Sequence, residues 1–553
     1  MEDSTRGRAG RNRKWRVGSA LAALALGALA GPAGAELSRR DRLAVLYSNQ
    51  VIFDRAGEPL VSVRITEGQS RVEVESAGGV TLLPGADDGS RVRARDGARW
   101  TITLADAHPG EARHWIAAER IGAQDPAAVA AARARWAADG REVATFEAGA
   151  LLGISGETLD TRVVTIGIEP KATEAEARAA AAALGLADAE VVAEPRTRAG
   201  GWIVAREAKS GVEIRARDLL WFSPDPGATL TIPDLEWGHG TPKRGHARRT
   251  YAGDLYVAVG NDGRLAVVNL LSAERLLEGV VPSEIYPSAP PAALQAQAVA
   301  ARGQLLAKVG TRHRSDPYLL CAETHCQKYT GETRTNPATS AAVAATRGQL
   351  LFDAAGLVDT VYSAACGGHT EAADAMWGGA PRASLPGLTD TASPDVAPVE
   401  DVDAFLAHPD PAAVCAWKGD HFRWTRTLTG AQLSAAVGTR AAIGPVHTVL
   451  PTRRGRSGRA LAVRYVGRDG DVEVAGSYVN RTLLGGLKSG LWQVRREGGA
   501  PDGEPARWIF SGAGFGHGVG LCQHGAIGMA RQGHAVEAIL RHYYPGSALR
   551  RAW

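Results

Sequence analysis

A short cysteine–histidine segment has the residue types that suit metal binding. Cys321 and Cys326 bracket CAETHC, His325 precedes the second cysteine, and His313 lies eight residues before the first. Two thiolates and two imidazoles can hold zinc tetrahedrally. A Cys321–Cys326 disulfide is the alternative in an oxidising compartment. We therefore predict either a structural zinc site or a disulfide, and in both cases the bond would fix a loop rather than activate water.

Glu284 is the acidic residue whose surroundings favour proton transfer. It follows Pro282 and Ser283 in a turn that we expect between two helices. Its sequence neighbours are apolar, namely Val280, Val281, Ile285 and Tyr286. Apolar surroundings raise the pKa of a carboxyl, as a general acid at neutral pH requires. A helix-capping or salt-bridged glutamate is the alternative, because most glutamates are structural or solvated.

The glycine-rich segment GFGHGVG predicts a loop that brings His517 close to a ligand. Glycine is costly inside a regular helix or strand, and a sugar polymer is bound by the amide and hydroxyl contacts such a loop offers. A buried, hydrogen-bonded histidine is the alternative. For Cys366, Cys415 and Cys522 we expect one disulfide and one buried thiol. A nucleophilic Cys366 is disfavoured, because a reactive thiol needs a paired base and exposure.

The N-terminus has the three parts of a signal peptide. Six basic residues within 6–16 precede the apolar run 18–30, and Ala-Gly-Ala at 33–35 is a cleavage signature. The apolar run is shorter than the roughly 20 residues of a spanning helix. We therefore predict export to the periplasm, cell envelope or exterior, with no transmembrane segment after signal cleavage. The net charge of +4 is too mild to predict a nucleic-acid partner.

The alternation of elements predicts an α+β, multidomain fold. After the signal peptide (1–35), residues 36–110 contain alternating, β-branched runs separated by turn residues, and we predict a small β-rich region there. Residues 111–222 combine strands and alanine-rich helices in the order β-α-β-β-α-β, and a capping box opens the second helix. Residues 223–249 are rich in proline and glycine and are predicted as a linker. Residues 250–553 are predicted as one mixed, β-rich and helical domain.

Three ordered blocks within about residues 250–548 resemble the SpoIID/LytB domain family. The first is VNLLSAERLLEGVVPSE (268–284), followed by a helix containing QAVAAR (297–302). The second is VYSAACGGHTE (361–371), and the third is GFGHGVGLCQHGA (514–526). The upstream β-α-β-β-α-β order is similar to the SPOR domain, a ferredoxin-like module that binds glycan strands stripped of stem peptides.

The resemblance implies a peptidoglycan lytic transglycosylase, with Glu284 as the acid that cleaves N-acetylmuramic acid–N-acetylglucosamine strands to 1,6-anhydro products. The substrate-binding residues it implies are Gln297, Arg302, Ser363, Gly367, Gly368, His369, Thr370, His517 and Gln523. Some members hold zinc through two cysteines and two histidines, here His313, Cys321, His325 and Cys326. LytB-type members enhance an N-acetylmuramoyl-L-alanine amidase, so a non-catalytic peptidoglycan-binding enhancer is the alternative. We expect no organic cofactor.

Overall fold

A computed structural model describes residues 46, 51–85, 91–154, 157–186, 189–238, 244–500 and 503–553. The predicted signal peptide, residues 1–35, lies outside the described residues. Among the helices within the described residues, none combines the length and apolar character that a membrane crossing requires.

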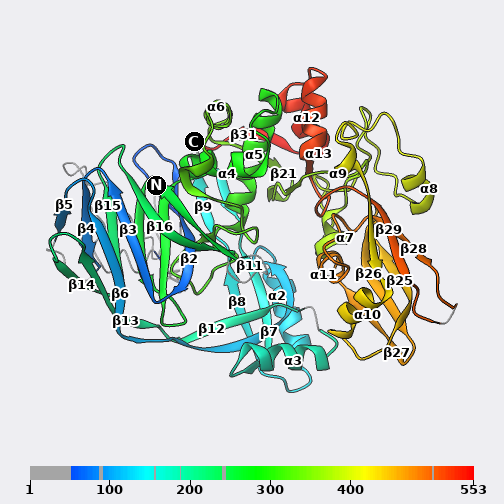
Figure 1. The fold of residues 1–553 in the computed structure, drawn as a ribbon, viewed down its shortest axis with the longest axis horizontal. Helices are drawn as coiled ribbons and strands as arrows, with labels where there is room; N and C mark the ends of the chain where they lie inside the picture. The colour runs from blue at the N-terminus through cyan, green and yellow to red at the C-terminus, as the bar shows by residue number, and fades with distance from the viewer. Residues whose placement is uncertain are drawn as a thin grey trace, which may run out of the picture. The chain divides into compact units, whose positions relative to one another are not determined.

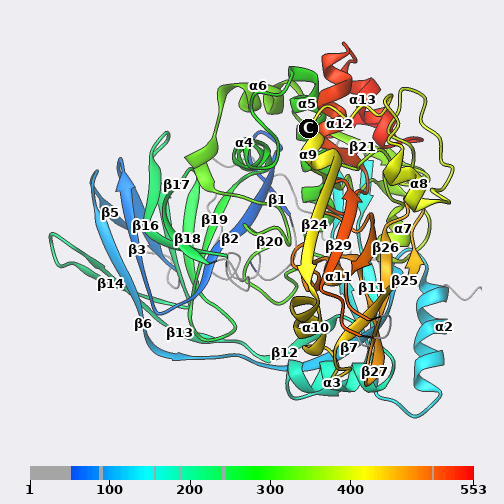
Figure 2. The same cartoon turned by 45° about the vertical axis from the view of Figure 1, so that its right-hand side comes forward.

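Two largely antiparallel sheets share the largest hydrophobic core (Figures 1 and 2). The eight-stranded sheet runs β1 (Ile52–Phe53), β2 (Pro59–Gln69), β19 (Leu265–Ser272), β18 (Asp254–Val259), β15 (Leu219–Pro224), β4 (Val80–Pro84) and β5 (Val92–Ala94), with β20 (Leu320–Cys321) parallel to β2. The six-stranded sheet runs β14 (Glu213–Arg217), β13 (Gly200–Glu207), β6 (Arg99–His108), β3 (Arg71–Ala77), β16 (Thr229–Trp237) and β17 (Gly245–Tyr251). Alternate apolar side chains enter the core, among them Val61 and Val63 of β2 and Ile102 of β6.

The prediction of a linker at 223–249 is wrong, because β16 and β17 lie within that segment. Leu230 and Ile232 of β16 are buried, and the pairing register shifts between Ile232 and Leu235. Proline lacks a backbone N–H and is accommodated at such an irregularity, so the Pro233 that suggested a linker sits inside a strand. The described strands within residues 36–110 likewise form no sheet by themselves, because β2 pairs with β19 and β3 with β16.

A smaller unit has the predicted β-α-β-β-α-β order. Its elements are β7 (Glu111–Gly122), α2 (Pro126–Ala137), β8 (Val143–Ala148), β11 (Val163–Lys171), α3 (Glu174–Ala183) and β12 (Val191–Thr197), with the hairpin β9 (Leu151–Ile154) and β10 (Glu157–Asp160) inserted. The antiparallel sheet runs β12-β7-β11-β8. Ala132 of α2 and Ala177 of α3 pack with Ile166 of β11 in a separate core. The predicted capping box of Thr173 and Glu176 is confirmed, but the unit's sheet ends at Thr197 rather than near residue 222.

Helices from both ends of the C-terminal half pack together (Figure 1). They are α4 (Ala273–Glu284), α5 (Pro291–Lys308), α6 (Pro337–Ala345), α12 (Gln523–Arg531) and α13 (Val536–Tyr543), with η1 (Gly331–Arg334) beside α4. The strands among them are β21 (Gln349–Asp353), β22 (Gly356–Leu357), β31 (Ala548–Arg551), and the parallel pair β23 (Tyr362–Ser363) and β30 (Leu521–Cys522). α5 begins at Pro291 as predicted, since proline is well suited to a first helical turn. α4 extends through Pro282, so Glu284 ends a helix instead of lying in the predicted turn.

The segment between β23 and β30 builds another core. Its two three-stranded sheets are β24 (Arg423–Thr429), β29 (Arg507–Ala513) and β28 (Trp492–Glu497), and β25 (Val446–Arg454), β26 (Ala460–Gly467) and β27 (Gly470–Ala475). Its helices are α7 (Ala373–Trp377), α8 (Val402–Ala407), α9 (Gly419–Phe422), α10 (Gly430–Gly438) and α11 (Ser477–Leu483). Trp492 and Phe510 are fully buried between these sheets and helices, with ring centroids 5.3 Å apart.

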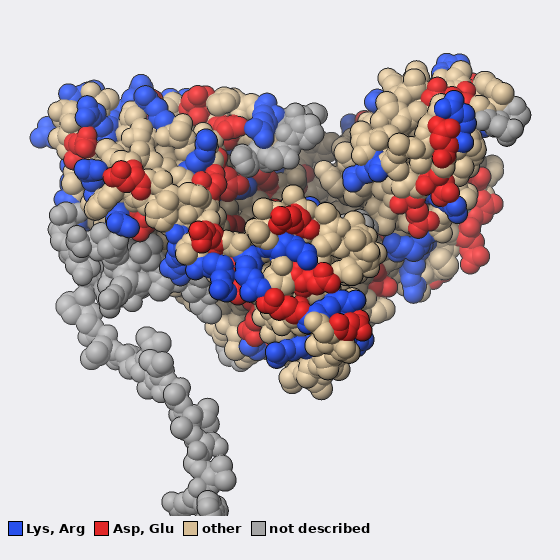
Figure 3. All heavy atoms as spheres, turned by 90° about the horizontal axis from the view of Figure 1, so that it is seen from below, with Lys and Arg blue, Asp and Glu red and all other residues tan. Residues whose placement is uncertain are grey.

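The surface mixes both signs of charge on the face shown in Figure 3, where lysine and arginine alternate with aspartate and glutamate. Exposed ion pairs are present among the described residues, such as Arg120 with Glu190, whose charged atoms lie 2.5 Å apart. A face on which opposite charges alternate produces no single-sign field to steer a polyelectrolyte.

Candidate functional site

Glu284 has the electrostatic setting that the sequence predicted. Its side chain is half-buried at the C-terminus of α4, and the backbone N–H of Lys328 donates to its Oε1 at 3.0 Å. Burial raises the pKa of the carboxyl, and the Lys328 N–H and the charge of Lys308 oppose that rise. A carboxyl with a raised pKa holds its proton closer to neutral pH, which is the property a general acid needs.

A buried ion pair fixes the helix that carries Glu284. Arg302 of α5 donates from Nε and Nη2 to the two carboxylate oxygens of Glu274 of α4, at 2.8 and 2.7 Å. The backbone N–H of Gly348 and the indole of Trp553 also donate to Glu274, each at 3.0 Å. The Arg302 side chain is 0% exposed, so the structure places it in the scaffold rather than on the substrate surface expected from the sequence.

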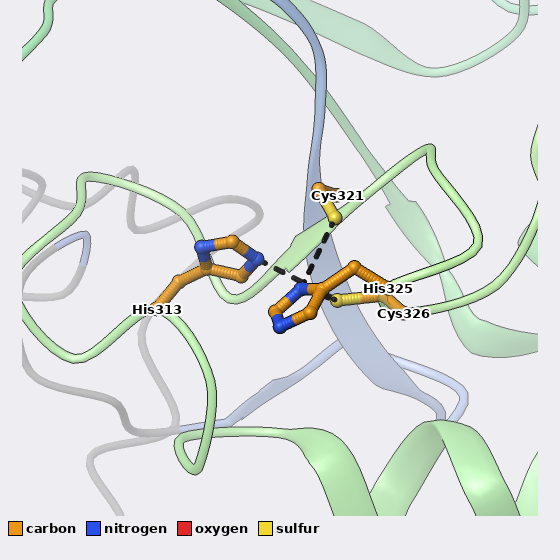
Figure 4. Close-up of side chains that lie close together, drawn as sticks. All are labelled: His313, Cys321, His325 and Cys326. Atoms are coloured by element: carbon orange, nitrogen blue, oxygen red, sulfur yellow. Dashed lines mark hydrogen bonds between the residues drawn. The ribbon is translucent and has the colours of Figure 1, made fainter. Parts of the chain in front are cut away.

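The loop between α5 and η1 brings together the four predicted metal ligands (Figure 4). Cys326 Sγ lies 3.5 Å from His313 Nε2 and 3.7 Å from His325 Nδ1, and Cys321 Sγ lies 3.7 Å from His325 Nδ1. Donors on a tetrahedral zinc ion with ordinary bond lengths are separated by roughly 3.3–3.8 Å. His313 Nδ1 also lies 3.0 Å from Asp316 Oδ2, the outer carboxylate contact that orients metal-bound histidines. The donor set therefore fits a metal ion.

The cysteines in this structure are all free thiols. This is true of Cys321 and Cys326, and equally of Cys366, Cys415 and Cys522. The expected disulfide among the last three is therefore absent, and those three thiols meet Asp390 in a second buried group that could hold a metal.

The Cys/His loop touches the surroundings of Glu284 directly. Lys328, two residues after Cys326, supplies the N–H bonded to Glu284. The Lys308 ammonium donates to the Cys326 carbonyl and is close enough to influence the pKa of Glu284. Burial lowers the pKa of Lys308, and neighbouring acidic groups oppose the change. The geometry of this loop therefore sets two of the groups that tune Glu284, and Lys308 is a residue that sequence reasoning missed.

The second and third sequence blocks meet through the short strands β23 and β30. Ser363 is paired with Cys522, so Gln523 follows directly beside it. Gln523 Nε2 donates to Gln297 Oε1 of α5 at 3.1 Å. Ser363 Oγ and Gln297 Nε2 are buried without a hydrogen-bond partner among the described residues. Because buried polar atoms usually have partners, these two are available to the hydroxyl or amide groups of a ligand.

His517 is held as a neutral imidazole against the same strand. The backbone N–H of Val519 donates to its Nδ1 at 3.0 Å, which leaves the proton on Nε2. Burial and two nearby arginines lower the pKa of His517 to about 3. Gly516 has φ of 108°, and a Cβ there would lie 2.7 Å from Ser363 Cβ, so glycine is what lets the loop approach β23. Burial and the nearby Glu284 also raise the pKa of Tyr362, which places this strand near the acid.

The residues from Gly367 to Thr370 form a structural support. Both ring nitrogens of buried His369 face carbonyl oxygens, of Thr370 at 2.6 Å and of Ala397 at 2.9 Å. Thr370 Oγ1 exchanges hydrogen bonds with the backbone of Leu388. Gly367 and Gly368 have positive φ, and a Cβ on Gly367 would lie 2.5 Å from the Gly514 nitrogen. These four predicted contacts position the loop of His517 rather than offering free polar groups.

Exposed aromatic rings surround these residues, and sequence reasoning missed them. Tyr286, just after Glu284, is 47% exposed and its ring stacks at 6.1 Å on His524. His524 also contacts Trp417 at 5.0 Å, and Trp377 contacts His517 at 5.1 Å. Ligand sites are commonly lined by aromatic rings beside a few polar groups, as these rings are here. In the sequence, Tyr286 follows Glu284 closely and Trp377 lies six residues after the second block, whereas Trp417 lies near none of the three blocks.

Comparisons with known proteins connect this site to a family. Residues 261–352, which include Glu284 and the Cys/His loop, match the SpoIID family, described as "Stage II sporulation protein". Residues 372–520 match a domain of unknown function.

The relatives found cover about half of this chain. An uncharacterized protein of Brachyspira hyodysenteriae is 29% identical over 301 residues, 54% of this chain and 71% of the relative. The "Amidase enhancer" of Bacillus subtilis is 27% identical over 300 residues, 49% of this chain and 40% of the relative. "Stage II sporulation protein D" of Bacillus subtilis is 26% identical over 310 residues, 52% of this chain and 76% of the relative. The Glu284 site lies in the matched segment, so this part of the chain, residues 261–352, belongs to the SpoIID domain family.

Proposed function

We propose that this chain is an exported lytic transglycosylase that cleaves peptidoglycan glycan strands between N-acetylmuramic acid and N-acetylglucosamine. The observation that carries the proposal is the state of Glu284. Its pKa is raised by burial, and the charged groups that act on it in the described part of the chain are the cations Lys308 and Lys328. A single carboxyl with a raised pKa, on which no second carboxylate acts among the described residues, suits chemistry that needs one acid and no activated water.

In the proposed reaction Glu284 acts first as acid and then as base. Its proton passes to the glycosidic oxygen as the bond from that oxygen to muramoyl C1 breaks. The carboxylate then takes the proton from the C6 hydroxyl of the same muramoyl unit, and O6 bonds to C1. The products are a 1,6-anhydromuramoyl end and a free N-acetylglucosamine hydroxyl, and Glu284 regains its proton. Ser363, Gln297 and Gln523 are proposed to hydrogen-bond the sugars, and Tyr286 to stack on an apolar sugar face.

We propose zinc as the ion for His313, Cys321, His325 and Cys326, because tetrahedral sulfur and nitrogen ligands suit it. When bound, it would supply structural cross-linking and no reacting group. The loop so closed presents the Lys328 N–H to Glu284 at 3.0 Å, so the proposed role of the ligands is to keep that N–H in place.

The β-α-β-β-α-β unit is proposed to be a SPOR-like glycan-binding module. Its strand order β12-β7-β11-β8 and its separate core support the proposal. A module tethered to the Glu284 site would raise the local concentration of glycan strands. The chain lacking residues 111–197 should then bind denuded strands more weakly in a sedimentation assay, whereas unchanged binding would refute this role.

A relative named amidase enhancer supports a second candidate function. In that case the chain would bind peptidoglycan without cleaving it and would increase the activity of a cell-wall amidase. The two candidates share the Glu284 site and differ in whether a glycosidic bond breaks.

Mass spectrometry of purified glycan strands after incubation with the chain tests both candidates. The variants are Glu284→Gln and, as a matched control on the same helix, Glu278→Gln, which loses only its pairing with Arg275. We expect anhydromuramoyl products from the native chain and the control, and none from Glu284→Gln. Products with reducing ends would mean ordinary hydrolysis. Strands that are bound but uncut by all three proteins, with a stimulated amidase, would establish the enhancer function instead.

A further inference from the structure

A second group of metal-ligating side chains is buried away from the Cys/His loop. Cys366, Cys415, Cys522 and Asp390 are each 0% exposed. One donor atom from each lies within 4.8 Å of all the others. Cys366 Sγ is 3.2 Å from Asp390 Oδ2 and 3.6 Å from Cys415 Sγ. Neither the proposed reaction nor the predicted zinc loop uses these residues.

The contacts around the group suit thiolate and carboxylate ligands. The backbone N–H groups of Cys366 and Gly525 donate to Cys522 Sγ at 3.2 and 3.3 Å. The Tyr543 hydroxyl donates to Asp390 Oδ1 at 2.7 Å, which leaves Oδ2 directed to the sulfur atoms. Outer hydrogen bonds of this kind orient metal ligands and fix which oxygen can coordinate.

Burial makes a bound cation the best explanation of this composition. A buried carboxylate among thiols is costly unless an opposite charge accompanies it. The buried guanidinium of Arg459 donates to the carbonyl oxygens of Cys366 and His369 and to Ser457, not to the Asp390 carboxylate. His542 Nε2 lies 3.4 Å from Asp390 Oδ1, the oxygen that Tyr543 also contacts. Three sulfur donors and one oxygen favour zinc over hard cations such as magnesium or calcium.

We propose that Cys366, Asp390, Cys415 and Cys522 form a second, structural zinc site. Sulfur and oxygen donors on a tetrahedral zinc ion are separated by roughly 3.4–3.8 Å, close to the 3.2 and 3.6 Å from Cys366 Sγ to Asp390 Oδ2 and to Cys415 Sγ. Four protein ligands in a fully buried setting leave no position for water, so the site would not perform hydrolysis. Binding would release the thiol protons to solvent.

The site would join four segments that are distant in the sequence. Cys366 follows β23, Asp390 and Cys415 lie in loops, and Cys522 caps the N-terminus of α12. The next residue is Gln523, which bonds to Gln297 beside the unpartnered Ser363. The ion would therefore hold the start of α12 against β23, at the edge of the Glu284 site.

Zinc content per chain tests the proposal. The purified full chain is compared with Cys415→Ser, with Asp390→Asn, and with Cys321→Ser/Cys326→Ser, in which the second group is intact. Inductively coupled plasma mass spectrometry should find one zinc ion fewer in Cys415→Ser than in the native chain. The double variant should retain one zinc ion whether or not the first group binds metal, which separates the two sites.

If Cys415→Ser fails to fold, measurements on the Cys321→Ser/Cys326→Ser double variant and on the native chain still test the proposal. Cobalt substituted into the double variant should give sulfur-to-metal charge transfer and tetrahedral d–d bands. X-ray absorption of its zinc should show a sulfur shell at about 2.3 Å. Absence of metal from the double variant would overturn the proposal. So would a disulfide between Cys366 and Cys415, detected by alkylating the native chain in denaturant without reductant.

Discussion

Replacing Arg302 by methionine separates a structural role from a substrate-binding role at this position. The guanidinium is fully buried, and the Glu274 side chain it pairs with is 10% exposed. Arg302→Met leaves that carboxylate buried with only the Gly348 and Trp553 donors. Removing one partner of a buried ion pair costs about 3–5 kcal/mol. We expect the free energy of unfolding of the variant to fall by that amount.

Two further variants test whether the loss in Arg302→Met comes from the buried ion pair with Glu274. Glu274→Met/Arg302→Met removes both charges and should recover most of the loss, because neither charge is then buried alone. Arg178→Met removes an exposed pair with Glu174 on α3 and should cost less than about 1 kcal/mol. Urea unfolding followed by circular dichroism measures all three. If Arg302→Met unfolds like the native chain but no longer binds glycan strands, Arg302 contacts the substrate as the sequence suggested.

The remaining predictions concern the site itself. Transglycosylase activity should decline as pH rises through the raised pKa of Glu284, because the acid form is lost; a pH–rate profile unchanged across that range would contradict this. The folded state binds this proton more tightly than the unfolded state, so stability falls as pH rises from about 4.3 to the raised pKa. Glu284→Gln should therefore melt higher than the native chain at neutral pH and lose that advantage below about pH 4; equal melting temperatures at neutral pH would count against it. Tyr286→Ala should weaken strand binding several-fold in a titration without changing the melting temperature, and loss of stability instead would make the ring structural. Gly516→Ala should be destabilised by about 1–3 kcal/mol in urea unfolding, because it has positive φ and its Cβ would meet Ser363.

Local sequence rules identified many elements. The capping box at Thr173 and the proline start of α5 are present, because each depends on hydrogen bonds and dihedral limits within one turn. The β-α-β-β-α-β order is also present. The linker prediction failed because Pro233 lies within β16 and Gly245 begins β17, and these strands form by pairing with each other and with β3, which is distant in the sequence.

Some roles of the candidate site residues could likewise be predicted from the sequence, and others could not. Residue type and short spacing indicated Glu284 as a candidate acid and the four residues of the Cys/His loop as candidate ligands, and the resemblance to the SpoIID/LytB family indicated the Gln523 block. It assigned His369 and Thr370 to the substrate, whereas backbone carbonyls and amides occupy their polar atoms. No spacing along the chain reveals such partners.

The sequence by itself determined which residues could act as acid, ligand or loop, because those properties belong to side chains and to turns of a few residues. Only the tertiary structure decided that Arg302 serves the scaffold, that the Lys328 N–H meets Glu284, and that Cys366, Asp390, Cys415 and Cys522 converge. The physical reason is that burial, the pKa of a carboxyl and the geometry of a metal site depend on groups far apart in the chain, such as Cys366 and Cys522, which are 156 residues apart. Packing brings these groups together, and their spacing in the chain does not reveal it.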